Sequence, residues 1–186
     1  MNENMKKLIF IVNPISGTQS KELILNLLDE KIDKEKYTWD VVYTKRAGHA
    51  IEIAAQAAEM KTDVVVAIGG DGTINEIGRS LVHTETALGI IPCGSGNGLA
   101  RHLHIPMEPK KALEIINDGI CDIIDYGKIN GTDFFLYLRS RIRRFRQSEI
   151  CQCRKTRIID LSGKNIAGES DLSTRNLRTG NRRRYL

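Results

Sequence analysis

The sequence predicts an α/β fold, in which a parallel sheet carries helices on both faces. Short apolar runs alternate with segments of helical pattern from residue 7 to about residue 135, and this alternation is typical of parallel sheets. Three of the apolar runs end in glycine-rich turns. Because ligands of such sheets bind at the carboxyl ends of the strands, we expect the three turns to meet at one edge and to form one site.

The individual elements follow from the hydrophobic pattern. Strands are expected where short apolar or β-branched runs occur, and helices where apolar residues recur on one face. The predicted strands cover residues 7–13, 38–43, 63–68, 88–91 and 123–129. The predicted helices cover residues 21–33, 48–60, 74–81, 99–103 and 109–117. An Asn-Gly pair after the last strand predicts a hairpin at residues 130–131.

The charge of the chain changes sign near residue 135. The 186 residues carry a net charge of +5 and suffice for one ordinary domain, or for one domain and a fragment. Residues 1–135 hold 14 Lys and Arg against 19 Asp and Glu, whereas residues 136–186 hold 14 against 4. The first part is therefore acidic at −5 and the tail basic at +10. A break of this kind predicts a boundary, with one domain over 1–135 and a separate tail over 136–186.

Nothing in the sequence predicts a membrane span or a metal cluster. No apolar run approaches the roughly 20 residues that cross a bilayer, and the N-terminal apolar stretch ends at Asn13, too early for a signal peptide. We therefore expect a cytoplasmic protein. The four cysteines are expected to be reduced thiols, because neither a lone C-x-C pair nor His102 and His104 have the spacing of a metal site.

The turn at residues 69–73, Gly-Gly-Asp-Gly-Thr, is the most informative of the three. Glycines let the backbone approach a ligand closely, and the helix after the turn would point its N-terminal amides at an anion. Asp71 stands among the glycines, where one carboxylate beside a phosphate suits Mg²⁺. A tight turn with an Asp cap is the alternative, but a simple turn would not need three glycines.

The other two turns are weaker signals on their own. Gly-Ser-Gly-Asn-Gly at residues 94–98 is permissive, and Ser95 and Asn97 could donate hydrogen bonds to a phosphate or an adenine. Ser16 and Gly17 come after the first strand, where they could form either a helix cap or a ligand loop. The chain has neither G-x-x-x-x-G-K-[ST] nor G-x-G-x-x-G after its first strand. These absences exclude a P-loop protein and an ordinary dinucleotide fold.

Four motifs in order resemble the diacylglycerol kinase catalytic domain. They are IVNPISG, YTKRAGHA, GGDGTINEI and PCGSGNGLAR. This family also contains sphingoid-base kinases, ceramide kinases and bacterial lipid kinases, and the resemblance covers residues 7 to about 135. The GGDGT element is shared with NAD kinases and phosphofructokinases, whereas NPxSG and GSGN separate the lipid kinases from them.

The resemblance implies ATP and Mg²⁺ as cofactors and phosphoryl transfer to a lipid hydroxyl of diacylglycerol or of a sphingoid base. The ATP site that it implies consists of Asn13, Ser16, Gly17, Thr44, Gly69, Gly70, Asp71, Gly72, Thr73, Asn75, Glu76, Gly94, Ser95, Gly96 and Asn97. Asp71 would lie nearest the metal. Arg101 could pair with a phosphate or be a surface charge. Gly98 stands where many bacterial diacylglycerol kinases carry Asp, which leaves the lipid head group open.

In this family the catalytic base and the lipid pocket come largely from a second, β-rich domain. That domain should come after residue 135, and the sequence lacks it, so we expect little or no kinase activity from this chain. The complete enzyme would act at the inner face of the membrane as a peripheral protein. No nucleic-acid partner is expected, and a homodimer is one option. The alternative functions are an NAD kinase-like enzyme, or a nucleotide-binding half whose basic tail binds nucleic acid or an acidic membrane.

Three interpretations of the tail compete. It could be a basic extension that binds nucleic acid or membrane, a disordered linker, or the product of a reading-frame error. Back-translated and read one nucleotide later from Phe135, the tail permits GVGFDA, which resembles the next motif of the family, and then runs with helix and strand periods. A run of T encoding Phe134 and Phe135 would be a simple place for a one-base insertion. We favour this frameshift hypothesis.

Overall fold

The computed structural model of the chain describes residues 5–16, 21–129, 132–135 and 154–159. Twelve elements lie in this part of the chain. The strands are β1 (Lys6–Val12), β2 (Tyr37–Tyr43), β3 (Val64–Gly69), β4 (Ala87–Pro92), β5 (Cys121–Ile129), β6 (Thr132–Phe134) and β7 (Arg154–Ile159). The helices are α1 (Lys21–Lys31), α2 (His49–Glu59), α3 (Asp71–Leu81), α4 (Gly98–His102) and α5 (Pro109–Asp118).

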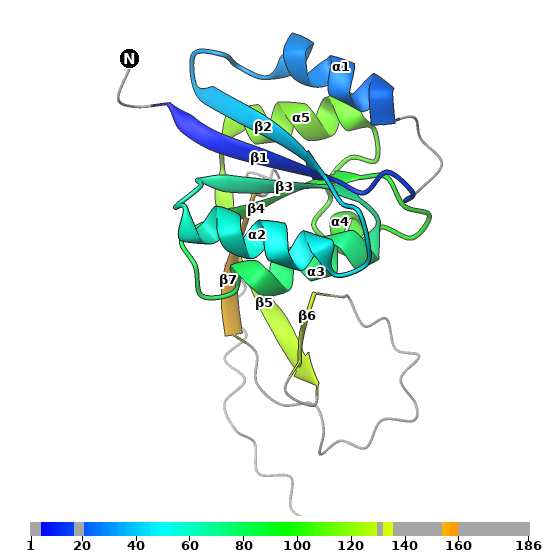
Figure 1. Cartoon of the computed structure of the whole chain (residues 1–186), viewed down its shortest axis with the longest axis vertical. Helices are drawn as coiled ribbons and strands as arrows, with labels where there is room; N and C mark the ends of the chain where they lie inside the picture. Colours follow the sequence, from blue (N-terminus) through cyan, green and yellow to red (C-terminus); the bar gives the residue numbers. More distant parts are fainter. Residues whose placement is uncertain (1–4, 17–20, 130–131, 136–153, 160–186) are drawn as a thin grey trace, which may run out of the picture.

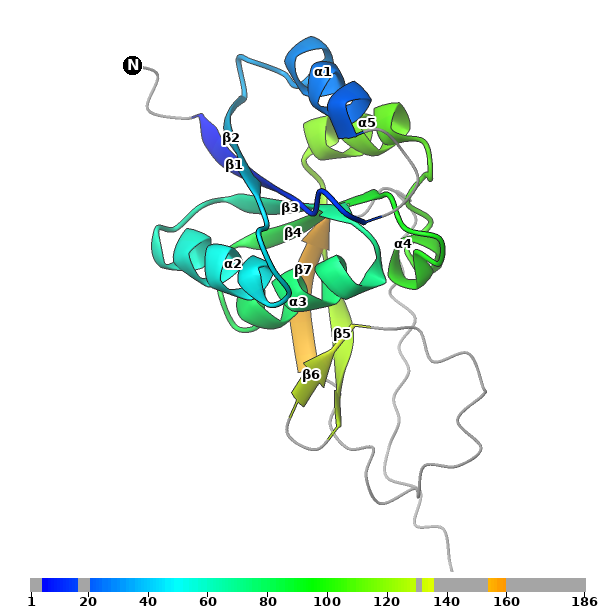
Figure 2. The same cartoon turned by 45° about the vertical axis from the view of Figure 1, so that its right-hand side comes forward.

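A parallel sheet forms the centre of the molecule. Strands β2, β1, β3 and β4 pair in that order and run in one direction. Every residue of β3 and β4 is buried, as expected of strands covered on both faces. Helices α1 and α5 cover one face, and α2 and α3 cover the other (Figures 1 and 2). The predicted fold class, a parallel sheet with helices on both faces, is therefore confirmed.

The main difference from the predicted elements lies at the start of α3. The helix begins at Asp71, three residues before the predicted position, so Asp71, Gly72 and Thr73 form its first turn. Gly70 remains extended and precedes the helix, and its carbonyl accepts the first helical bond from Ile74 at 3.1 Å. The glycine-rich turn is therefore shorter than the motif suggests. The bounds of the other predicted helices and strands differ from the observed ones by no more than two residues.

The second half of the sheet is antiparallel. β5 pairs with β6 through Ile129 and Thr132, which confirms the predicted hairpin, although residues 130–131 themselves are not described. β7 lies between β4 and β5. It pairs antiparallel with β5, and it pairs parallel with β4 at one position, Leu88 with Ile158. This strand was not predicted, because the tail shows no β period. The expectations for residues 136–153 and 160–186 concern a region outside the described residues.

Helices α1 and α5 are joined by one side chain. Asn117 donates from Nδ2 to the carbonyl of Lys31, at 2.6 Å, and accepts from the amide of Asp33 at 3.1 Å. The amide group thus serves a carbonyl and an N–H at the end of α1, where helical partners are missing. Nearby, the hydroxyl of buried Tyr37 donates to the carbonyl of Ile116 at 3.1 Å.

The residues that the structure describes form this one α/β unit, and a second β-rich domain is not among them. In the same described part, no helix is both long enough and apolar enough to pass through a lipid bilayer.

Removal of the Asn117 side chain tests how α1 is held. We expect Asn117→Ala to lower the free energy of unfolding by about 1–2 kcal/mol, because two backbone groups lose their partner. Asp118→Ala, at the exposed neighbouring position, should change it by less than about 0.5 kcal/mol. Urea unfolding of both variants measures the difference. Equal values for the two would contradict the capping role of Asn117.

Candidate functional site

The carboxyl ends of the four parallel strands are linked by backbone hydrogen bonds. The amide of Asn13, just after β1, donates to the carbonyl of Ile68 in β3 at 3.2 Å. The amide of Cys93, just after β4, donates to the carbonyl of Gly69 at 2.8 Å. Three segments that are far apart in sequence therefore leave the sheet side by side. The predicted convergence of the glycine-rich turns on one edge is confirmed.

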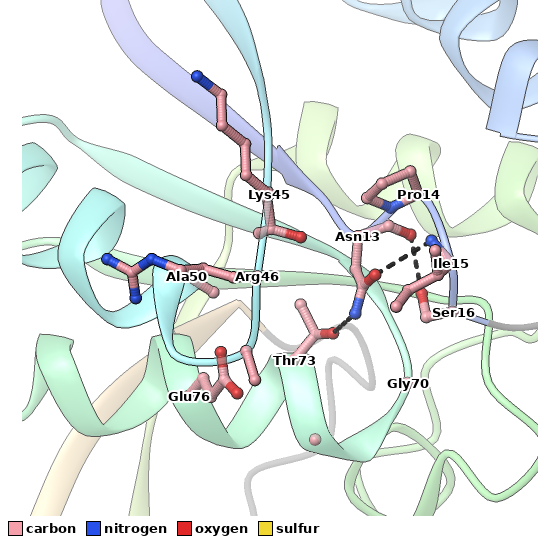
Figure 3. Close-up of a pocket in the computed structure, with 13 residues that line it drawn as sticks. Asn13, Pro14, Ile15, Ser16, Lys45, Arg46, Ala50, Gly70, Thr73 and Glu76 are labelled. Carbon is pink, nitrogen blue, oxygen red and sulfur yellow. Dashed lines mark hydrogen bonds between the residues drawn. The ribbon is translucent and has the colours of Figure 1, made fainter.

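A pocket of about 300 Å³ lies at this edge (Figure 3). This volume is at the lower end of the range for small-molecule sites. Three segments line it: the loop after β1, the loop after β2 with the start of α2, and the start of α3. The lining residues are Asn13, Pro14, Ile15, Ser16, Thr44, Lys45, Arg46, Ala47, Ala50, Gly70, Gly72, Thr73 and Glu76.

Asn13 organises the first wall of the pocket. Its side-chain oxygen accepts from the amide of Ile15 at 3.2 Å, and its carbonyl accepts from the hydroxyl of Ser16 at 3.0 Å. Its side-chain nitrogen donates to the hydroxyl of Thr73 at 3.2 Å, which ties this loop to α3 (Figure 3). The Ser16 hydroxyl is thus engaged with Asn13, and α1 is described from Lys21 onward, so the helix-cap alternative for Ser16 stays a prediction. Gly17 lies outside the described residues.

The second wall comes after β2. Thr44 is buried, and its amide donates to the carbonyl of Val12 at 2.9 Å. The next two residues, Lys45 and Arg46, also line the pocket. The Arg46 guanidinium forms two bonds to the Glu52 carboxylate, at 2.6 and 2.8 Å, on the exposed surface. The sequence did not single out Lys45 and Arg46 as site residues, although a basic pair directly after a strand at this edge was the available signal.

The third wall is the first turn and a half of α3. Gly70, Gly72 and Thr73 line the pocket, together with Glu76 one turn further. The helix N-terminus carries free amides and the positive end of the helix dipole, so this wall favours an anion. Gly69 is needed for packing, because a Cβ there would lie 2.7 Å from Thr73 Oγ1. The carboxylate of Glu76 accepts from the amide of Gly48 at 3.3 Å, linking α3 to α2.

The loop at residues 94–97 supports the pocket from behind and does not line it. A Cβ on Gly94 would lie 2.6 Å from the Cα of Gly70, so the two backbones nearly touch. Asn97 is 4% exposed with φ 51°, and its amide group bonds both the N–H and the carbonyl of Gly94, at 2.9 and 2.7 Å. ATP contacts from Gly94, Ser95, Gly96 and Asn97 therefore stay a prediction.

Asp71 lies between the two glycine loops. Its Oδ1 accepts from the amide of Gly98 at 2.6 Å, and a Cβ on Gly96 would come within 2.6 Å of its Oδ2. Asp71 does not line the pocket, and the described residues contain no group of three His, Cys, Asp or Glu that could hold a metal. Mg²⁺ beside a phosphate can use a single carboxylate. Asp71 as a metal ligand thus fits the residues present and stays a prediction.

Three further residues of this edge have clear contacts. Arg101 donates from Nε to the carbonyl of Gly96 at 2.9 Å, so it holds the supporting loop. Burial raises the pKa of the Cys93 thiol, which disfavours the reactive thiolate. Asn75, which the resemblance places in the ATP site, does not line the pocket; its side-chain oxygen accepts from the amide of Phe135 at 2.9 Å.

The fold and the site together define an α/β domain with a pocket at the carboxyl ends of its parallel strands, beside a helix N-terminus suited to a phosphate-bearing ligand. Comparison with known families gives the same result more specifically. The family described as "Diacylglycerol kinase catalytic domain" matches residues 7–129, and the chain belongs to this family.

Named relatives of this chain are diacylglycerol kinases as well. The diacylglycerol kinase of Bacillus subtilis (strain 168) is 37% identical over 133 residues, which cover 70% of this chain and 44% of that protein. A diacylglycerol kinase of Staphylococcus saprophyticus is 35% identical over 134 residues, 69% of this chain and 43% of that protein. A crystal structure of a diacylglycerol kinase from Bacillus anthracis (strain Sterne) superposes with a TM-score of 0.61 at 27% identity, covering 72% and 49% of the two chains. The chain spans less than half the length of these relatives.

Two glycine substitutions test the packing of the site. Gly94→Ala should lower the free energy of unfolding by about 1–3 kcal/mol, because the new methyl group meets the backbone of Gly70. Gly72→Ala is the matched control, since a Cβ there meets nothing within 4 Å and its position is helical. We expect it to be neutral or to stabilise by up to about 1 kcal/mol. Thermal unfolding of both variants decides, and a Gly94→Ala protein as stable as the wild type would show that the backbones are not in contact.

Proposed function

We propose that this chain carries the nucleotide-binding half of an ATP-dependent lipid kinase, and that the pocket binds ATP with Mg²⁺. The observation that carries the proposal is the meeting of the Asn13–Ser16 loop with the glycine-rich start of α3. Family membership supports the same conclusion, because the matched segment contains all three walls. The named relatives are diacylglycerol kinases.

Different residues of the pocket would bind different parts of a nucleotide and its metal ion. Gly72, where a Cβ would meet nothing within 4 Å, leaves room for phosphates beside the N-terminal amides of α3, and these amides with the helix dipole favour negative charge. Lys45 and Arg46 line the opposite wall, where the Arg46 charge is offset by its ion pair with Glu52. Mg²⁺, which Asp71 would help to hold, supplies neutralisation of charge on the transferring phosphoryl group. The chemistry then depends mainly on position and electrostatics.

We further propose that this chain transfers little or no phosphate by itself. The resemblance assigns the base that receives the lipid hydroxyl proton, and the lipid pocket, to a second domain. The described residues form the α/β unit alone. The acceptor we propose is diacylglycerol or a sphingoid base, met at the inner face of the membrane. Gly98, whose amide bonds Asp71, is the position that leaves these two lipids open.

ATP binding is testable in the chain as it stands. Gly72→Ala should weaken ATP binding about tenfold, or about 1.4 kcal/mol, because its methyl group enters space at the phosphate wall without disturbing the fold. Glu59→Ala, an exposed change on α2, is the control and should leave the affinity unchanged. Calorimetric titration with ATP and Mg²⁺ measures both. An unchanged affinity in Gly72→Ala would place the nucleotide elsewhere.

Phosphoryl transfer and the frameshift hypothesis can be tested together. Radiolabelled ATP is offered with a short-chain diacylglycerol, with sphingosine or with NAD, and this chain should transfer label to none of them.

DNA sequencing through the codons for residues 134–146 should reveal one base fewer in the native gene. The protein made from that gene should transfer label to a lipid in the same assay. If either protein transfers label to NAD and to neither lipid, an NAD kinase-like enzyme is favoured instead. An unchanged gene would refute the frameshift.

A further inference from the structure

Helix α3 also makes contacts on the face opposite the pocket. Thr73 and Glu76 line the pocket. Asn75 and Gly78 lie on the other side of the helix, since successive residues are about 100° apart around its axis. This far face contacts β6 and the residue directly after it, as the closeness of α3 and β6 in Figures 1 and 2 shows.

Phe135 is docked on this face by both its backbone and its ring. Its amide donates to the side-chain oxygen of Asn75 at 2.9 Å, across 60 residues of sequence. Its ring lies so close to α3 that a Cβ on Gly78 would be 2.7 Å from a ring carbon. The residue is 2% exposed. Gly78 therefore makes room for the Phe135 ring, and Asn75 supplies the acceptor for the Phe135 backbone amide.

Strand β5 closes the docking site from the other side. The rings of Tyr126 and Phe135 pack with centroids 5.6 Å apart and planes tilted by 35°. Tyr126 is 3% exposed, and its hydroxyl is 3.2 Å from Nε2 of His83, just beyond the end of α3. The aromatic ring that supports Phe135 is thus itself anchored to the same helical segment.

We propose that Asn75 is a positioning residue, which docks the chain at Phe135 and so fixes where residues 136 onward leave the nucleotide-binding half. The first turn and a half of α3 forms the pocket wall, and Asn75 lies on the opposite face of the same rigid helix, between the pocket-lining residues Thr73 and Glu76. Because α3 holds Phe135, the position of Phe135 relative to the pocket is fixed. The family match ends at residue 129, so this contact joins the matched domain to the part of the chain beyond it.

This role differs from the ATP contact that the resemblance implies for Asn75. A phosphate ligand at this position would use the donor end of the amide, whereas the docking uses its acceptor oxygen. Substitution by Asp separates the two roles, because a carboxylate still accepts from the Phe135 amide but would repel a phosphate. The docking does not depend on the identity of the nucleotide.

Amide hydrogen exchange of Phe135 is the direct measurement. The chain contains four phenylalanines, so protein labelled with ¹⁵N-phenylalanine gives few signals, and Phe135→Leu assigns the relevant one. In Asn75→Ala the Phe135 amide should exchange about tenfold faster or more, because its acceptor is gone. Phe10, buried in β1, is the internal reference and should change by less than about twofold. In Asn75→Asp the protection of Phe135 should be retained.

The ATP affinity of Asn75→Asp completes the test. We expect it to stay within about twofold of wild type, whereas a carboxylate next to a phosphate would weaken binding about tenfold or more. Unchanged exchange of Phe135 in Asn75→Ala, or a large loss of ATP affinity in Asn75→Asp, would overturn the proposal. If Asn75→Ala does not fold, Asn75→Ser, whose hydroxyl is too short to reach, replaces it. Failure of the wild type to bind ATP would count against the proposed function and leave the exchange result valid.

Discussion

The site depends on the close approach of two backbones at the edge of the sheet. Gly70 and Gly94 come so near that a Cβ on Gly94 would lie 2.6 Å from the Cα of Gly70. This contact is possible only because β3 and β4 are adjacent and parallel, so that both turns leave the sheet together. The Asn97 side chain, which bonds both polar groups of the Gly94 backbone, holds the supporting loop in that position.

Helix α3 transmits this arrangement to the rest of the domain. Its N-terminus forms the pocket wall that favours an anion, and its far face docks Phe135 through Asn75 and Gly78. Its links to the loop after β1, through Asn13 and Thr73, and to α2, through Glu76, tie all three walls to one rigid body. A displacement of α3 caused by a change on one of these faces is therefore expected to alter the contacts of the other face, since a short helix moves as a unit.

The motifs predicted the correct edge of the sheet, but they did not show which of its residues line the pocket and which support it. Asn13, Thr44, Gly70, Thr73 and Glu76 were predicted site residues, and the structure brings them together around the pocket. Ser95 and Asn97 belong to the supporting loop behind it. That distinction could not be read from the motifs, because a glycine that lets a ligand approach and a glycine that lets another backbone approach look the same in a sequence.

The sequence by itself determined the fold class, the order of the elements and the family, because hydrophobic periods and glycine-rich turns are local signals read directly from neighbouring residues. Tertiary structure alone decided which side of each loop faces the pocket, that Lys45 and Arg46 line it, and that Asn75 binds Phe135. It also placed β7 between β4 and β5. These are contacts between residues far apart in the chain, and their partners are chosen by packing in three dimensions, which no local pattern records.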